Sequence, residues 1–107
     1  MRYLVTWKFL QVPPQMAKTE LALLEATETW IEEQKKAGFC IEIWQYTDGG
    51  GGVAIVEAES NDVLHQKLLE APYSILQQYC VTPLTDIKVA IGEAKKLFQK
   101  IIGMTGT

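Results

Sequence analysis

The single histidine, His65, is the residue in this sequence best suited to acid–base chemistry. Imidazole is the only side chain that titrates near neutral pH without help from its surroundings, so His65 is the candidate for catalytic proton transfer or metal ligation. The competing interpretation is a boundary residue on a short amphipathic helix. No second histidine, Cys-x-x-Cys pair or carboxylate–histidine spacing accompanies it, and the sequence therefore predicts no metal site.

Aromatic side chains provide a candidate pocket for a small ligand. Tyr3, Trp7, Trp44 and Tyr46 offer planar apolar surfaces, and Gln45 adds a neutral amide beside them. Such a set suits a small, planar, apolar ligand held by few polar groups. The alternative is that these aromatics belong to the core and to an interface, where residues of this type dominate packing.

Four consecutive glycines, Gly49 to Gly52, raise the question of a phosphate-binding loop. Gly49, Gly51 and Ala54 match the spacing G-x-G-x-x-G/A, but that motif functions only when it opens a helix. The residues that follow, VAIVEA, have the pattern of a strand, and the Lys-Ser/Thr ending of a P-loop is missing. The glycines therefore predict a hairpin turn, in which positive φ angles are needed.

The periodicity of apolar residues predicts the elements that position these side chains. Strands are expected at 2–10, 39–46, 53–58 and 80–91, and helices at 17–37, 62–70 and 93–103. The order is that of a ferredoxin-like βαββαβ fold of the α+β class, with an antiparallel sheet and an additional C-terminal helix. Residues 1–91 are expected to form this domain, and residues 92–107 the C-terminal helix and tail.

The strands carry large apolar residues on both faces, although helices cover only one face of such a sheet. The uncovered face predicts a homodimer, or a larger oligomer, that forms through the sheet faces. The expected topology also places Cys40 and Cys80 on opposite edge strands. These strands lie roughly 14 Å apart, beyond the limit of about 7 Å for a disulfide, so no bridge within the chain is expected.

Composition limits the classes of partner. The chain has 107 residues, of which 48% are hydrophobic and 21% charged, and its net charge is −3. One globular domain is expected, without the basic stripe of a nucleic-acid-binding protein. No apolar run is long enough for a membrane helix, and no signal peptide is recognised. Two cysteines without such a signal indicate a cytoplasmic protein.

The segment ESNDVLHQKLLEAPY, together with Trp44 and the interval of 21 residues between Trp44 and His65, resembles a known family. It is similar to the dimeric α/β-barrel superfamily, and within it to muconolactone-isomerase-like chains, over about residues 1–91. The resemblance implies a dimeric barrel and a cofactor-independent enzyme that acts on a small aromatic or lactone compound. His65 would then be the acid/base, and Tyr3, Trp44 and Gln45 would shape the pocket.

Two positions depart from the active relatives. Isomerases of this type carry an arginine after the tryptophan, where this chain has Gln45, and a neutral amide cannot supply a bidentate charged clamp. Haem-degrading relatives pair a helix histidine with a first-strand asparagine, where this chain has Thr6. The expectation is a dimer that binds a small apolar ligand in the helix–sheet cleft. It is expected to have no catalytic activity and no cofactor. The alternative is an isomerase or monooxygenase-like enzyme, with haem binding as a minor variant.

Overall fold

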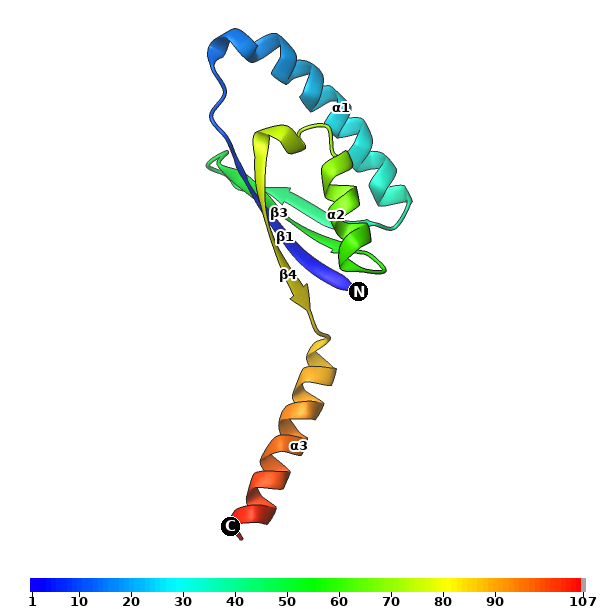
Figure 1. Cartoon of the computed structure of the whole chain (residues 1–107), viewed down its shortest axis with the longest axis vertical. Helices are drawn as coiled ribbons and strands as arrows, with labels where there is room; N and C mark the ends of the chain where they lie inside the picture. The colour runs from blue at the N-terminus through cyan, green and yellow to red at the C-terminus, as the bar shows by residue number, and fades with distance from the viewer. Residues whose placement is uncertain (107) are drawn as a thin grey trace.

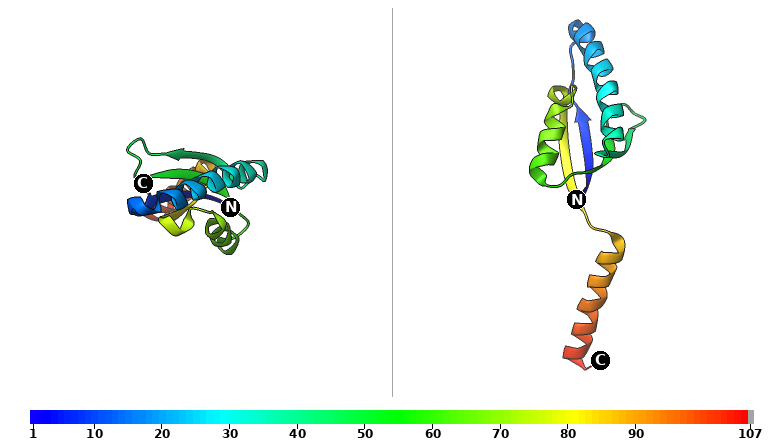
Figure 2. Two further views of the ribbon diagram at one scale, coloured as in Figure 1. Left: turned by 90° about the horizontal axis from the view of Figure 1, so that it is seen from above. Right: turned by 90° about the vertical axis from the view of Figure 1, so that its right-hand side faces the viewer.

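The computed structural model describes residues 1–106 and has the α+β ferredoxin-like architecture that the sequence predicts (Figure 1). The strands pair in the order β2-β3-β1-β4, all antiparallel. Helices α1 and α2 lie on the same face of this sheet (Figure 2). The elements are β1 (Arg2–Phe9), α1 (Ala17–Lys36), β2 (Cys40–Gln45), β3 (Gly51–Glu57), α2 (Asn61–Glu70), β4 (Gln77–Leu84) and α3 (Ile87–Thr105), with short 3₁₀ turns at Pro14–Met16 and Ser74–Leu76.

Alternation along β1 separates the two faces of the sheet. Tyr3 and Val5 point toward the helices and are 0% and 2% exposed, whereas Leu4 and Thr6 point to the opposite, open face. Val5 pairs with Ala54 of β3, which is also buried. The core therefore lies between the central strands and the two helices.

The glycine run makes a hairpin turn between β2 and β3, as expected. Gly49 has a φ of 77°, the left-handed conformation that glycine adopts at little cost. The Gly49 amide donates to the Tyr46 carbonyl at 2.9 Å, and the Tyr46 amide donates to the Gly51 carbonyl at 2.8 Å. The Asp48 carboxylate accepts from the Gly50 amide at 2.8 Å. The glycines lead into a strand, so their amides do not form a phosphate-binding helix terminus.

Gly51 and Gly52 have a second role, which is to let Trp7 approach the backbone of β3. A Cβ atom on Gly52 would lie 2.2 Å from Cζ2 of Trp7 and 2.5 Å from the Trp44 carbonyl oxygen. A Cβ atom on Gly51 would lie 2.0 Å from the Trp7 carbonyl oxygen. Only glycine fits at these two positions, which register places opposite Trp7 and Lys8 of β1.

A bulge in β2 changes which of its residues face the helices. The register shifts between Cys40 and Glu42, so Cys40 pairs with Val56 and Ile43 with Ala54. Strict alternation would place Cys40 on the same face as Glu42 and Trp44, but the extra residue of the bulge reverses the alternation. Cys40 and Ile43 face the helices, and Trp44 faces the open side.

The expected end of the fourth strand is also wrong. The strand was predicted to reach Ile91, but β4 ends at Leu84, and α3 begins at Ile87. The Asp86 carboxylate accepts hydrogen bonds from the amides of Lys88 and Val89, which makes Asp86 the N-cap. Helix α3 continues through Gly92, because one glycine costs a helix only about 1 kcal/mol.

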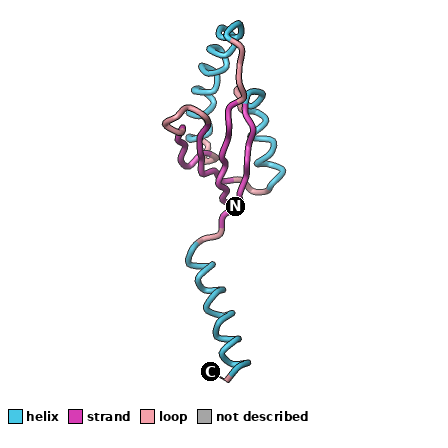
Figure 3. Tube along the Cα trace, turned by 90° about the vertical axis from the view of Figure 1, so that its left-hand side faces the viewer, coloured by secondary structure: helices cyan, strands magenta, loops and turns pink. Residues whose placement is uncertain are grey.

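Helix α3 projects away from the rest of the fold (Figure 1, Figure 3). The described chain measures 70 × 28 × 23 Å as a result, and α3 has no buried residue. Its apolar side chains are exposed, Phe98 to 62% and Ile102 to 54%. None of the helices in residues 1–106 is long and apolar enough to cross a membrane.

The two cysteines are free, as predicted. Cys40 is buried in the core beneath the helices, and Cys80 is exposed on β4. The strands that carry them, β2 and β4, form opposite edges of the sheet.

The connection between α2 and β4 is held against α1 by Tyr73. Its hydroxyl donates a hydrogen bond to the Glu20 carboxylate, and its ring makes an edge contact with Phe9 at a centroid distance of 5.5 Å. Burial, followed by the hydrogen bond to Glu20 and the charge of that carboxylate, raises the pKa of Tyr73 to about 12. The phenol is therefore a neutral hydrogen-bond donor at physiological pH.

We expect Gly52→Ala to destabilise the protein by about 2 kcal/mol or more, because the new methyl group overlaps the Trp7 indole and the backbone of β2. Gly50→Ala is the matched control in the same glycine run, since a Cβ there would meet only the Asp48 carboxylate, at 3.2 Å. Chemical denaturation of both variants measures the difference. Equal stabilities would contradict the close approach of Trp7 to β3.

Candidate functional site

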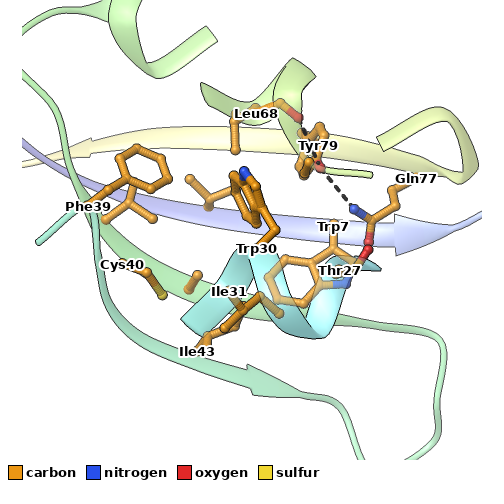
Figure 4. A pocket seen from close by; sticks show the side chains of 14 residues that line it. Trp7, Thr27, Trp30, Ile31, Phe39, Cys40, Ile43, Leu68, Gln77 and Tyr79 are labelled. Atoms are coloured by element: carbon orange, nitrogen blue, oxygen red, sulfur yellow. Dashed lines mark hydrogen bonds between the residues drawn. The ribbon is translucent and has the colours of Figure 1, made fainter. Parts of the chain in front are cut away.

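A pocket lies between α1, α2 and the helix-facing side of the sheet (Figure 4). Its cavity volume is about 70 Å³, more than one water requires and about half of the roughly 150 Å³ that holds a benzene ring. The pocket is partly open, so a ring bound here would extend through its open side. Apolar and aromatic side chains form most of its wall. The lining residues are Val5, Trp7, Thr27, Trp30, Ile31, Phe39, Cys40, Ile43, Ala54, Val56, Leu68, Ala71, Gln77 and Tyr79.

Helix α1 places three pocket residues on one stripe. Thr27, Trp30 and Ile31 are separated by three and four positions, which brings them to the same face of the helix. The Trp30 ring makes an edge contact with Phe39, just before β2, at a centroid distance of 6.4 Å. This contact fixes one wall of the pocket.

Three polar atoms of the pocket wall are buried without a hydrogen-bond partner in residues 1–106. They are Nε1 of Trp7, Oγ1 of Thr27 and Nε1 of Trp30. A buried polar group that makes no hydrogen bond costs about 1–3 kcal/mol, so native proteins contain few of them. The three atoms have almost no exposed surface, so they are enclosed by the packed side chains and do not open into the cavity.

A fourth polar group of the pocket is already engaged. Nε2 of Gln77 donates to the Tyr79 hydroxyl at 2.8 Å, and that hydroxyl makes a long contact of 3.5 Å with the Leu68 carbonyl oxygen. Burial raises the pKa of Tyr79, with the Gln77 hydrogen bond acting in the opposite direction. Tyr79 is therefore a neutral phenol, and the hydrogen bond that its hydroxyl donates is weak.

The pocket lining contains no Asp, Glu, His, Lys or Arg. Its titratable members are Tyr79 and Cys40. Burial raises the pKa of the Cys40 thiol, and the nearby charge of Lys35 opposes this change. Both groups hold their protons at neutral pH, so the wall offers hydrogen-bond donors and no strong base.

His65 lies outside this pocket. It is exposed on α2 and borders a separate, shallow groove between α2 and the end of β4. The other groove residues are Asn61, Leu64, Leu68, Val81 and Pro83. Leu68 alone belongs to both hollows, and the structure does not bring His65 together with the predicted aromatic residues.

The four predicted ligand-binding residues are divided among different surroundings. Trp7 lines the pocket. Tyr3 is fully buried in the core, and its hydroxyl donates to Oδ1 of Asn61 at 2.8 Å. Trp44 is 58% exposed on the open face of the sheet, and Gln45 beside it is also exposed.

Four residues of the pocket wall were not predicted as site residues: Thr27, Trp30, Gln77 and Tyr79. The spacing of Thr27 and Trp30 on the predicted helix was a usable signal, because it places both on the face that covers the sheet. Gln77 and Tyr79 alternate on β4 in the same way, but the strand was expected to begin only at Cys80.

The structure also bears on metal and haem binding. No group of three or more His, Cys, Asp or Glu side chains gathers within residues 1–106 in a way that could hold a metal ion. A cavity of about 70 Å³ is far too small for a haem macrocycle, and the groove at His65 is shallow. The pocket residues therefore do not fit a haem.

Comparisons with known proteins agree with this fold. Residues 1–88 match the family described as Muconolactone delta-isomerase. A crystal structure of muconolactone isomerase superposes with a TM-score of 0.73 at 14% identity, covering 80% of this chain and 90% of that one. A 5-chloro-2-hydroxyhydroquinone dehydrochlorinase from Burkholderia phenoliruptrix, in complex with 2,5-dihydroxybenzoquinone, gives 0.61 at 21% identity, covering 79% and 94%. No curated protein sequence matches the chain.

We expect Thr27→Val to stabilise the ligand-free protein by about 1 kcal/mol, because it replaces an unpartnered buried hydroxyl with a methyl group of similar shape. Thr29→Val on the exposed side of α1 is the matched control, and we expect it to change stability by less than half as much. Thermal unfolding measures both. A clear loss of stability in Thr27→Val would show that the hydroxyl is already satisfied.

Proposed function

The chain belongs to the muconolactone delta-isomerase family, and on this basis we propose that it binds a small, apolar ring compound in the pocket between α1, α2 and the sheet. The observation that carries the proposal is the cavity itself, whose wall is mostly apolar and aromatic and includes the hydrogen-bonded pair Gln77 and Tyr79. Apolar walls with a few convergent polar groups are typical of small-molecule sites.

The structural neighbours support a ligand of this kind. The dehydrochlorinase holds a planar ring, 2,5-dihydroxybenzoquinone, on the same fold. In the present chain, the rings of Trp7, Trp30 and Phe39 offer flat surfaces on which a ring can stack. We therefore infer that the ligand is planar or nearly so.

The second candidate is a cofactor-independent isomerase, which family membership favours. An isomerisation that moves a proton needs an acid and a base within hydrogen-bond reach of the substrate. The pocket offers the Tyr79 hydroxyl and the Cys40 thiol, whose raised pKa values suit proton donation rather than abstraction. His65 would have to act from outside the pocket, so binding without catalysis is the better supported proposal.

We also propose that the chain assembles with copies of itself through the open face of the sheet. Leu4, Val53, Ile55 and Trp44 lie on this face, and register places them side by side on three neighbouring strands. A contiguous apolar surface of this kind in a small domain usually marks an interface.

Helix α3 adds to the case for self-association. Residues 1–86 carry six basic and twelve acidic side chains, whereas residues 87–107 carry four basic and one acidic. The net charge is therefore −6 for residues 1–86 and +3 for residues 87–107. An exposed apolar helix of positive charge beside an acidic domain favours a second copy of the chain as its partner.

We propose a cytoplasmic location, which the two cysteines support. Cys40 and Cys80 are both free thiols, and Cys80 is exposed. Thiols persist in reducing compartments, where exposed ones are not converted to disulfides.

Titration with ethylbenzene, followed by NMR of the indole N–H groups, tests binding in the pocket. We expect the signals of Trp7 and Trp30 to shift, and that of Trp44 to stay constant because it lies on the open face. Ala54→Leu fills the cavity and should abolish the shifts, whereas His65→Ala should leave them unchanged. A shift of Trp44 alone, or loss of binding in His65→Ala, would contradict the proposed site.

Light scattering after gel filtration tests self-association. We expect the wild type to elute at a multiple of the chain mass of 12.0 kDa. Ile55→Lys places a charge in the centre of the open face and should shift the population to monomer, because a buried unpaired charge is costly. Leu69→Lys, at a 63% exposed position on α2, is the control. A wild-type monomer at micromolar concentration would overturn the proposal.

A further inference from the structure

We propose that helix α3 packs on the open sheet face of a second copy of the chain, and that two copies exchange this helix reciprocally. The arrangement rests on the self-association proposed above, and it names the segment that covers the open face. Two uncovered apolar surfaces of the same chain support it, one on α3 and one on the sheet, which match in length and carry complementary charge.

Helix α3 has one apolar face and one basic face. Its apolar side chains recur at intervals of three and four residues, which places them on one stripe, and the main members are Ile87, Ile91, Phe98, Ile101 and Ile102. All of them are exposed, and Lys88, Lys95, Lys96 and Lys100 lie outside the stripe. An amphipathic helix takes most of its stability from packing of its apolar face, and α3 contains two interior glycines that weaken it further. The helix therefore needs a partner surface.

The apolar stripe of α3 is too wide for pairing with a single helix. A two-stranded coiled coil buries a narrow seam of two positions in each heptad. On α3, Leu97, Phe98, Ile101 and Ile102 are all apolar, and at 3.6 residues per turn these four side chains span an arc of about 140°. A stripe of this width is typical of a helix that faces a broad surface such as a sheet.

The open face of the sheet offers a surface of matching length. Its apolar residues on β1, β2 and β3 continue onto β4 at Cys80 and Leu84, which pair with the open-face residues Thr6 and Arg2. Strands β1 and β4 have 8 residues each and are about 27 Å long, and α3 has 19 residues and is about 28 Å long. A helix that lies along these strands would cover the face from end to end.

The link between β4 and α3 favours the sheet of a second copy over the sheet of the same chain. Only Thr85 and Asp86 separate Leu84 from Ile87, and α3 leaves the end of β4 pointing away from the sheet (Figure 1, Figure 3). A return to its own open face would require the chain to reverse within these two residues. In a two-fold symmetric pair, the two links meet near the symmetry axis, and each α3 runs back along β4 of the other copy.

The distribution of charge favours a second copy over an anionic lipid surface. The net charge of residues 1–86 is −6 and that of residues 87–107 is +3, so each helix brings positive charge to an acidic domain. An anionic membrane would attract the lysines of α3, but it would repel the domain that carries them.

Cys80 and Ala94 allow a crosslinking test in the full-length chain. Cys80 lies four residues before the end of β4, about 13 Å away, and Ala94 lies seven residues after the start of α3, about 10 Å away. Both distances start at the link, so the exchange brings Cys80 of one copy close to position 94 of the other. We expect Ala94→Cys to form a covalent dimer with a short bismaleimide. Lys96→Cys, on the opposite face of α3, is the matched control and should form little or none.

The double variant Ala94→Cys, Cys80→Ser identifies the partner of position 94. We expect it to lose the covalent dimer, because the remaining native thiol, Cys40, is buried. A covalent dimer that persists would join two α3 helices, and a crosslink within one chain would place α3 on its own sheet. Either result would overturn the exchange.

A charge on the stripe tests whether α3 contributes to assembly. We expect Phe98→Lys to raise the dissociation constant of the dimer roughly tenfold or more, because it removes a buried ring and adds an unpaired charge. Gln99→Lys adds the same charge to the basic face and should leave the dimer intact. A dimer that Ile55→Lys dissociates but Phe98→Lys does not would overturn the exchange and leave assembly through the open face standing. A wild-type monomer at micromolar concentration would overturn both.

Discussion

The close approach of Trp7 to the backbone of β3 is the contact on which the pocket depends. The indole lies where a side chain at position 52 would be, and the Trp7 carbonyl lies where one at position 51 would be, so the two glycines make room for this residue. The ring lies on the helix-facing side, where it forms part of the pocket wall together with Thr27 and Trp30 of α1. The glycine run therefore has two physical tasks: Gly49 turns the chain through a positive φ, and Gly51 and Gly52 accept the tryptophan.

The pocket combines this geometry with an energetic cost in the ligand-free protein. Core packing normally removes cavities and pairs every polar atom, because both defects reduce stability. Here the cavity leaves part of its wall without packing neighbours. The unpartnered atoms of Trp7, Thr27 and Trp30 are a separate cost, because packed side chains enclose them and they do not open into the cavity. A ligand that fills the cavity would remove the packing cost alone.

Much of the fold could be predicted from the sequence, because alternation in β1 and the helical stripe of α1 are local patterns that tertiary packing reinforces. The sequence prediction differs from the structure at the end of the fourth strand and on the faces of β2. The boundary between the fourth strand and the C-terminal helix was predicted at Gly92, although the capping carboxylate of Asp86 starts the helix earlier. The bulge between Cys40 and Glu42 inverts a strand face, and no composition signal marks it. The site was harder to predict, because a cavity depends on distances between elements: Thr27 and Tyr79 become neighbours of one space only after α1 packs on the sheet.

Chemically reactive residue types do not mark the position of the pocket in this chain. His65 is the residue best suited to acid–base chemistry, yet it borders the groove at α2, while neutral side chains of α1 and β4 line the pocket. A binding site needs a concave space with suitable walls, and such a space is a property of the fold rather than of the residue type. The domain also has apolar surface on its open sheet face and on α3. Ligand binding on the helix-facing side and assembly through the open face, as proposed above, would therefore use separate surfaces.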